Sequence, residues 1–127
     1  MKIETFQFGT VSFNIDNILK FKSGLFGFEE LKDFLLIKPE DENIFYWLYS
    51  IQKPELGFPL IGLNVIYENF PAEEKCTSFG IVTMNQDPLK VTVNTKAPVY
   101  INQDEKTGFQ KIIEDDKYDV HYRLFVE

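Results

Sequence analysis

The stretch Ile44-Phe45-Tyr46-Trp47-Leu48-Tyr49-Ser50-Ile51 decides the fold class. An apolar run of this length fits a helix or a strand on periodicity alone. Its aromatic and β-branched composition, the acidic loop before it and the proline soon after it favour a strand. Side chains would then alternate between two apolar faces, with Phe45, Trp47, Tyr49 and Ile51 on one and Ile44, Tyr46 and Leu48 on the other. Both faces have to be covered by the chain, or one face is left for a partner protein.

Short runs of similar composition recur along the chain, separated by turn residues. We expect one or two helical turns after Glu29, a hairpin turn at Gly9-Thr10 and a break in strand structure at Ala97-Pro98. Further strands are expected before residue 9 and at 11–15, 18–21, 34–37, 58–65, 79–84, 90–95, 98–102 and 109–113. The fold class predicted is mainly β: a small antiparallel β-barrel or sandwich of many short strands, with at most one or two short helical turns, in a single domain over residues 1–127.

The charge of the chain excludes one class of partner and favours another. Twenty acidic and 13 basic residues give a formal net charge of −7. Such a field repels phosphates, so we expect no direct binding of nucleic acid, whereas a basic protein is a suitable partner. The single cysteine fits a reducing compartment, and neither a secretory signal nor an apolar run long enough to cross a bilayer is present. We therefore expect a cytoplasmic protein without membrane contact, monomeric when free.

The sequence offers little to catalysis or metal binding. His121 is the only histidine, and no CxxC or HxxxH motif occurs. The run Glu114-Asp115-Asp116 lacks the alternating oxygen ligands of a calcium loop, which favours a solvated acidic turn. Lys75 beside Cys76 would lower the pKa of the thiol if it were exposed, but an inert half-buried thiol is the commoner case. We expect no enzyme and no cofactor.

Three blocks of sequence resemble one family in the same order. Residues 21–28, Phe-Lys-Ser-Gly-Leu-Phe-Gly-Phe, are similar to the FxxGLxGF segment of the flagellar assembly factor FliW family. The aromatic stretch 45–58 resembles that family's centre, and residues 91–102 resemble its TVNLxAPIxIN segment. The family usually carries a longer acidic insert where this chain has only residues 67–78, and its usual Arg-His ending differs from residues 120–125 here.

The resemblance implies a non-enzymatic switch between two protein partners. Proteins of this family bind flagellin, the filament protein, and a small dimeric RNA-binding repressor, CsrA, which blocks translation of flagellin messenger RNA. Unsecreted flagellin captures the family member and frees the repressor. Antagonism of the repressor is implied to be allosteric, away from its RNA site.

The residues of the resembling blocks divide into two groups. We interpret one group as structural: Gly24, Gly27, Phe28, Trp47 and Pro98. The two glycines are expected to serve backbone geometry, and Trp47 is expected to lie in the core, as is Tyr49. The other group contains the candidate partner-binding residues. Two are asparagines inside apolar strands, Asn94 and Asn102, for which loop-forming hydrogen bonds are the favoured role. The other five are acids: Glu29, Glu30, Asp33, Asp104 and Glu105.

Two other functions fit the sequence less well. A small-molecule-binding β-barrel would line a cavity with the many aromatic residues, and it requires an interior too large for its own side chains to fill. A hydrolase of unfamiliar type would have to use His121.

Overall fold

The computed structural model describes residues 1–38, 40 and 43–126, and the mainly β class is confirmed. Helical structure in this described part is confined to short 3-10 turns. The elements are β1 (Lys2–Thr5), β2 (Gly9–Ser12), η1 (Ile15–Asn17), β3 (Leu19–Lys20), β4 (Asp33–Ile37), β5 (Tyr46–Ser50), β6 (Gly57–Gly62), η2 (Leu63–Val65), β7 (Thr77–Thr83), η3 (Pro88–Lys90), β8 (Thr92–Asn102), β9 (Thr107–Gln110) and β10 (Tyr122–Arg123).

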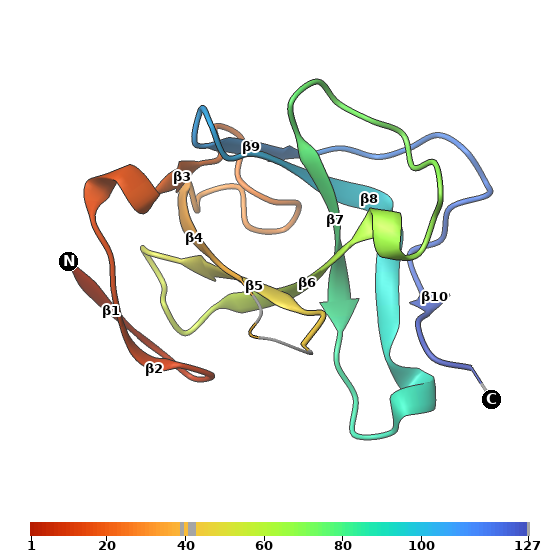
Figure 1. Cartoon of the computed structure of the whole chain (residues 1–127), viewed down its shortest axis with the longest axis horizontal. Coiled ribbons are helices and arrows are strands. Elements are labelled where there is room, and N and C mark those ends of the chain that lie inside the picture. The colour runs from red at the N-terminus through yellow and green to blue at the C-terminus, as the bar shows by residue number, and fades with distance from the viewer. Residues whose placement is uncertain (39, 41–42, 127) are drawn as a thin grey trace.

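Seven of these strands close into a barrel. The sheet order is β10-β8-β7-β6-β5-β4-β3-β9, and β9 also pairs with β8, so strands β3 to β9 form a ring (Figure 1). All pairings are antiparallel except the short parallel contact between β3 and β9, where Lys20 lies opposite Thr107. Closure leaves few strand edges exposed, which is the usual benefit of a barrel.

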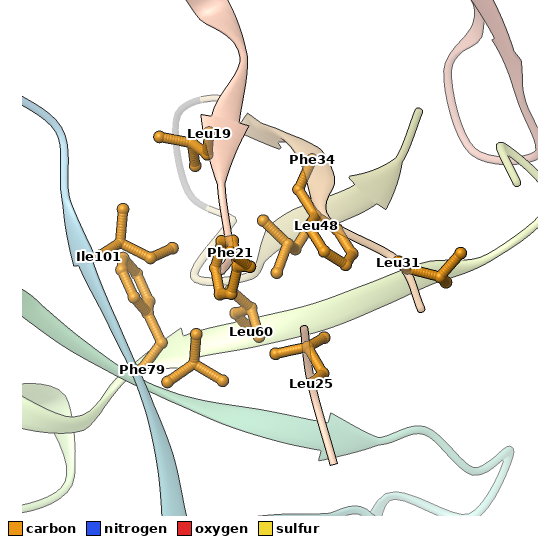
Figure 2. Close-up of a cluster of buried hydrophobic side chains, with 10 residues drawn as sticks. Leu19, Phe21, Leu25, Leu31, Phe34, Leu48, Leu60, Phe79 and Ile101 are labelled. Carbon is orange, nitrogen blue, oxygen red and sulfur yellow. The ribbon is translucent and has the colours of Figure 1, made fainter. Parts of the chain in front are cut away.

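The barrel interior is filled by side chains from the strands and from the segment that joins β3 to β4. Phe21, Leu25 and Leu31 of that segment lie among the strand residues, and the segment runs inside the ring of strands in Figure 1. Side chains of the protein itself therefore occupy this part of the barrel interior. Figure 2 shows the cluster, whose members are 0–3% exposed: Leu19, Phe21, Leu25, Leu31, Phe34, Leu48, Leu60, Phe79, Val99 and Ile101.

Both faces of β5 are covered, as its apolar alternation requires. Leu48 points into the barrel, whereas Tyr49 packs outside with Leu35 and with Ile3 of the β1–β2 hairpin. A further cluster lies over β6, β7 and β8, where the loop after η2 and the C-terminal segment bring Phe70 and Tyr118 together. The predicted assignment of side chains to the two faces of β5 is confirmed, and the hairpin is the element that covers the outer face.

The hairpin turn was predicted two residues too late. Residues 6–8 form the turn, and Gly9 and Thr10 begin β2, where Thr5 lies opposite Gly9. The Thr5 hydroxyl accepts a hydrogen bond from the Phe8 N–H at 3.0 Å and donates one to the Gly9 carbonyl at 2.9 Å. This side chain fixes a tight three-residue turn that the glycine alone did not reveal.

The helical turns expected after Glu29 do not form, and residues 29–34 are turn followed by strand. The side-chain oxygen of Gln52 accepts the backbone N–H groups of Lys32 and Asp33 at 2.7 and 3.0 Å. A helix would need these donors for its own ladder, so a tertiary contact has overridden local helix propensity.

A break in the strand was expected at Ala97-Pro98, but β8 runs through these residues without interruption. The interruption lies in its pairing with β7, where the register jumps from Asn94 opposite Ile81 to Val99 opposite Phe79. Between these points the backbone pairs with the C-terminal segment instead, through Thr95 N–H to the Asp119 carbonyl at 2.8 Å. Proline is tolerated at such an irregularity because it has no N–H to contribute to the ladder.

Candidate interaction surfaces

The glycine-containing motif at residues 21–28 builds a tight internal turn. Gly24 has a φ of +66° and Gly27 a φ of +87°, values that favour glycine. The Phe28 N–H donates to the Leu25 carbonyl at 2.8 Å, which closes the turn and holds Leu25 in the barrel interior. The motif is therefore structural, as expected for both glycines.

The other residues interpreted as structural behave in two ways. Pro98 is buried, and Phe28 packs edge-on against Phe58 with ring centroids 5.1 Å apart. Trp47 is only partly buried, on the outer face of the barrel, so its placement in the core was wrong. Tyr49, two residues later on the same face, is 1% exposed because the β1–β2 hairpin covers it.

Asn94 and Asn102 each organise a piece of local backbone. The side-chain oxygen of Asn94 accepts the N–H groups of Lys96 and Ala97 at 3.2 and 3.0 Å. That of Asn102 accepts the N–H groups of Asp104 and Glu105 at 3.1 and 3.0 Å, which shapes the β8–β9 turn. The Asn102 hydrogen bonds form a loop, as favoured, whereas those of Asn94 lie within β8, where its pairing with β7 is interrupted.

Four of the five candidate acids lie in two turns and the fifth, Asp33, begins β4, but lysines are interleaved with them. β3 runs between β4, which carries Asp33, and β9, which follows the Asp104-Glu105 turn. Lys20 of β3 forms an ion pair with Asp33 at 2.7 Å. Glu29 and Glu30 lie in the turn before β4, where the Lys32 ammonium donates to the Glu29 carbonyl oxygen. This surface carries mixed charge rather than a uniform negative field.

Glu29 is held as a carboxylate by its own turn. Its side chain accepts the Gly27 N–H at 2.9 Å. This hydrogen bond, together with one from the backbone N–H of Glu29 itself, lowers the pKa of the Glu29 carboxyl, and Lys32 adds a smaller effect.

The sequence alone did not reveal a second acidic surface, because its residues are far apart in the chain. Tyr67 and Phe70 pack against Tyr118 with ring centroids 5.2 and 4.9 Å away, which joins the loop after η2 to the C-terminal segment. We call acidic surface the exposed carboxylates on the two joined segments, among which the exposed Lys117 also lies: Glu68, Glu114, Asp115, Asp116 and Asp119. The run of residues 114–116 was its signal, read only as a solvated turn.

The residues considered for chemistry do not form a reactive site. His121 is exposed, and its backbone N–H donates to the Asp119 carboxylate at 2.8 Å. Burial, followed by the nearby carboxylates of Glu73 and Glu105, raises the pKa of the Cys76 thiol, opposite to the direction that Lys75 alone would give. Across the described residues 1–38, 40 and 43–126, no group of three acidic, histidine or cysteine side chains is placed to hold a metal ion.

An apolar surface beside the N-terminal hairpin was also missed. We call it the aromatic ledge, and it comprises the exposed Phe8 and three partly buried residues, Ile37, Trp47 and Pro59. The last three lie opposite one another on β4, β5 and β6, and the Phe8 ring meets Trp47 edge-on at 6.5 Å. Its signal was the Phe-Gln-Phe sequence at residues 6–8, which places two aromatic rings at a hairpin turn.

No helix in the described part of the chain is both long and apolar enough to span a membrane.

Comparison with known proteins covers the whole chain. A family model described as FliW protein matches residues 2–124. The flagellar assembly factor FliW of Clostridium tetani (strain Massachusetts / E88) is 32% identical over 141 aligned positions, which cover 100% of this chain and 97% of the relative. That of Clostridium botulinum (strain Okra / Type B1) is 33% identical over 141 positions, covering 100% of this chain and 99% of the relative. These relatives carry residues that the shorter 127-residue chain lacks.

The fold is similar to a solved structure as well. A solved structure described as "Crystal structure of the flagellar assembly factor FliW" superposes on this chain with a TM-score of 0.88 at 28% sequence identity. The superposition covers 100% of this chain and 99% of the other.

Proposed function

The chain belongs to the FliW family, and from this premise we propose that it is a flagellar assembly factor that switches between two protein partners. One partner is flagellin, and the other is a dimeric RNA-binding repressor of the CsrA type. The observation that carries the proposal is the match of sequence and fold to FliW proteins over nearly the entire chain.

The proposed switch is non-catalytic and operates in the cytoplasm before flagellin is exported. When flagellin is scarce, the protein binds the repressor and prevents it from blocking translation of flagellin messenger RNA. When unsecreted flagellin accumulates, it captures the protein, and the released repressor lowers flagellin synthesis. Which partner is bound depends on the difference between the two binding free energies and on the concentrations of the two free partners.

The charge of the chain supports the repressor arm of the proposal. A protein that binds RNA needs a basic surface to neutralise phosphates, and this chain carries a net charge of −7. The acidic surface formed by the loop after η2 and the C-terminal segment provides exposed carboxylates for such a partner. Attraction between opposite charges raises the association rate. At 0.1 M ionic strength, salt screens this attraction beyond about 10 Å.

Two mechanisms of repressor release make different predictions about salt. If the bound acidic protein repels RNA by Coulomb forces, release of RNA should become less efficient as ionic strength rises. If binding changes the shape of the repressor, as the family resemblance implies, release should persist at high salt once the complex has formed. Measuring RNA release at two salt concentrations, with the protein in saturating excess, separates these mechanisms.

The decisive experiment for the proposal is size-exclusion chromatography of the purified protein with each partner from the same genome. We expect co-elution with the repressor alone and with flagellin alone. Co-elution with flagellin only would leave a chaperone-like binder without the regulatory arm. Co-elution with neither would overturn the proposed function.

A further inference from the structure

The C-terminal segment continues the line of β9 along one edge of β8. β9 pairs antiparallel with residues 99–102 of β8, and β10 pairs antiparallel with Thr92 and Val93 of the same strand (Figure 1). Between them, the Ile113 N–H donates to the Lys96 carbonyl at 2.8 Å, and the Asp119 carbonyl accepts the Thr95 N–H at 2.8 Å. Because Thr95 and Lys96 are neighbours on β8, the chain leaves the edge after Ile113, forms a loop and returns to the edge at Asp119.

Few buried side chains hold this segment, and we call residues 112–124 the C-terminal strap. Of these described residues Tyr118 alone is buried, three are half-buried and the others are exposed. The Tyr118 ring packs against Tyr67 and Phe70, whereas the barrel interior is filled by a separate cluster from β3 to β9 and the segment before β4. A segment with little buried apolar surface opens at a lower free energy than the core of its domain.

One hydroxyl group joins the strap to β8. Thr95 is 0% exposed, and its Oγ1 accepts the Asp119 N–H at 2.9 Å and donates to the Asp119 carbonyl at 3.0 Å. The Tyr67 hydroxyl donates to the same oxygen at 3.1 Å, which brings the loop after η2 into the contact. A hydroxyl offers one donor and two acceptor positions, so all the hydrogen-bonding positions of Thr95 Oγ1 are used.

The chain just before the strap is anchored separately. The Lys111 ammonium forms an ion pair with the Glu73 carboxylate at 3.0 Å. The Lys111 N–H donates to the Pro98 carbonyl at 3.3 Å, next to the last pair of β9 with β8. The strap can therefore leave β8 after Lys111 while β9 keeps its place in the barrel.

We propose that the C-terminal strap undocks from β8 as one unit while the barrel stays folded, and that the Thr95 hydroxyl is the lock that keeps it docked. Undocking carries the four carboxylates of the strap away from Glu68 on the loop after η2, and so disperses the acidic surface. A partner that binds the assembled acidic surface shifts the strap toward its docked state, whichever protein that partner is.

Native-state hydrogen exchange, followed residue by residue by NMR, tests whether the strap opens separately. The reporters for the strap are the N–H groups of Ile113, Thr95 and Leu124, each of which bonds across the contact between the strap and β8. The reporters for the barrel are the N–H groups that pair β4 with β5. We expect the strap reporters to share one protection factor, at least about 100-fold below that of the barrel reporters. Equal protection of the two sets would overturn the proposal.

The Ile101→Val variant is the control that separates local opening from global unfolding. Ile101 is 1% exposed in the barrel interior, so the substitution weakens the barrel equally whether the strap is docked or undocked. We expect the barrel reporters to exchange about fivefold faster and the strap reporters to exchange at an unchanged rate. The same acceleration of both sets would show that the strap opens only when the whole protein unfolds.

Two substitutions of Thr95 test the lock. Thr95→Val keeps the shape of the side chain and removes both hydrogen bonds to Asp119, so the strap reporters should exchange at least about tenfold faster. Thr95→Ser keeps the hydroxyl and should stay within about threefold of the unmodified protein. Equal acceleration by Val and Ser, or no acceleration by Val, would show that the hydroxyl is not the lock.

A milder variant tests the lock even if Thr95→Val does not fold. Tyr67→Phe removes only the hydrogen bond from Tyr67 to Thr95 Oγ1, and the strap reporters should then exchange about fivefold faster. Unchanged exchange in Tyr67→Phe would contradict the part that this hydroxyl network has in docking. The comparison of the unmodified protein with Ile101→Val requires neither variant.

Discussion

The Cα of Gly24 faces the carbonyl oxygen of Phe28 so closely that a Cβ built on Gly24 would lie 2.6 Å from that oxygen. It would also lie 2.8 Å from the Glu29 Cα, and the backbone there has no flexible side chain that can move aside. This approach folds the segment before β4 back on itself and places Leu25 and Leu31 in the barrel interior. Side chains of the motif at residues 21–28 therefore fill part of the barrel interior.

We predict that Gly24→Ala destabilises the protein by about 3 kcal/mol, from left-handed backbone strain plus the clash with Phe28. Gly27→Ala is the matched control, because Gly27 also has a positive φ but a Cβ there would meet no described heavy atom within 4 Å. Strain alone should cost Gly27→Ala about 1–2 kcal/mol. Urea unfolding of both variants checks this order, and equal losses would show that the close approach to Phe28 does not matter.

Two adjacent residues of β5 should differ in their effect on stability. Leu48 is 0% exposed inside the barrel, so Leu48→Ala should cost about 4 kcal/mol through lost burial and a cavity. Trp47 is partly exposed on the ledge, so Trp47→Ala should cost only about 2 kcal/mol despite the larger side chain. A larger loss for Trp47→Ala in urea unfolding would contradict its peripheral placement.

Lys106 is a non-glycine residue in the left-handed region, with a φ of +58° in the turn between β8 and β9. We predict that Lys106→Gly raises the free energy of unfolding by about 1 kcal/mol, because relief of strain exceeds the added entropy of the unfolded chain. Lys106→Ala removes the same charge and keeps the strain, so its stability should equal that of the unmodified protein. An equal gain for both variants would assign the effect to charge.

Tyr100 should make stability fall at alkaline pH. Burial, with a smaller effect of the Glu73 carboxylate, raises the pKa of Tyr100 from 10.0 to about 12. Between these values the folded protein keeps a proton that the unfolded chain releases, so stability is present below pH 10 and declines as the pH rises toward 12. Its hydroxyl also donates to the Pro71 carbonyl at 2.8 Å.

At pH 8 the free energy of unfolding of Tyr100→Phe should therefore be about 1 kcal/mol lower than that of the unmodified protein, because the variant lacks this hydrogen bond. The difference between the two proteins should shrink by pH 11, because only the unmodified protein pays for retaining the Tyr100 proton. The raised pKa values of Tyr49 and Tyr67 affect both proteins equally and cancel from the comparison. A difference in unfolding free energy that stays constant from pH 8 to pH 11 would contradict the raised pKa.

The apolar alternation of residues 44–51 was sufficient to predict both the strand and the need to cover its two faces. It did not reveal that a hairpin at the chain start covers the outer face, because Ile3 and Tyr49 are far apart in sequence. Asn94 and Asn102 were named as candidate partner-binding residues, with loop-forming hydrogen bonds as the favoured role, because a polar side chain inside an apolar strand has to find a partner. Asn102 makes such bonds in a turn, and Asn94 makes its bonds within β8. The Asn102 hydrogen bonds could be predicted because their partner groups are two and three residues away, whereas the equally local bonds of Thr5 were missed.

The errors have the same physical origin. Gln52 takes the N–H groups that a helix after Glu29 would have used, from about 20 residues away. The acidic surface and the aromatic ledge likewise depend on segments that meet only in the folded chain, through Tyr67 with Tyr118 and through Phe8 with Trp47. Each surface left only a short local signal, residues 114–116 and residues 6–8, which did not show the segment that it meets.

A displacement experiment measures whether the protein exchanges the repressor for flagellin. The complex with the fluorescently labelled repressor is formed first, flagellin from the same genome is added in increasing amounts, and anisotropy reports the bound repressor. We predict that flagellin releases the repressor at a concentration set by the two separately measured dissociation constants. Flagellin that binds the complex while the repressor stays bound, giving one assembly of all three proteins, would contradict the switch.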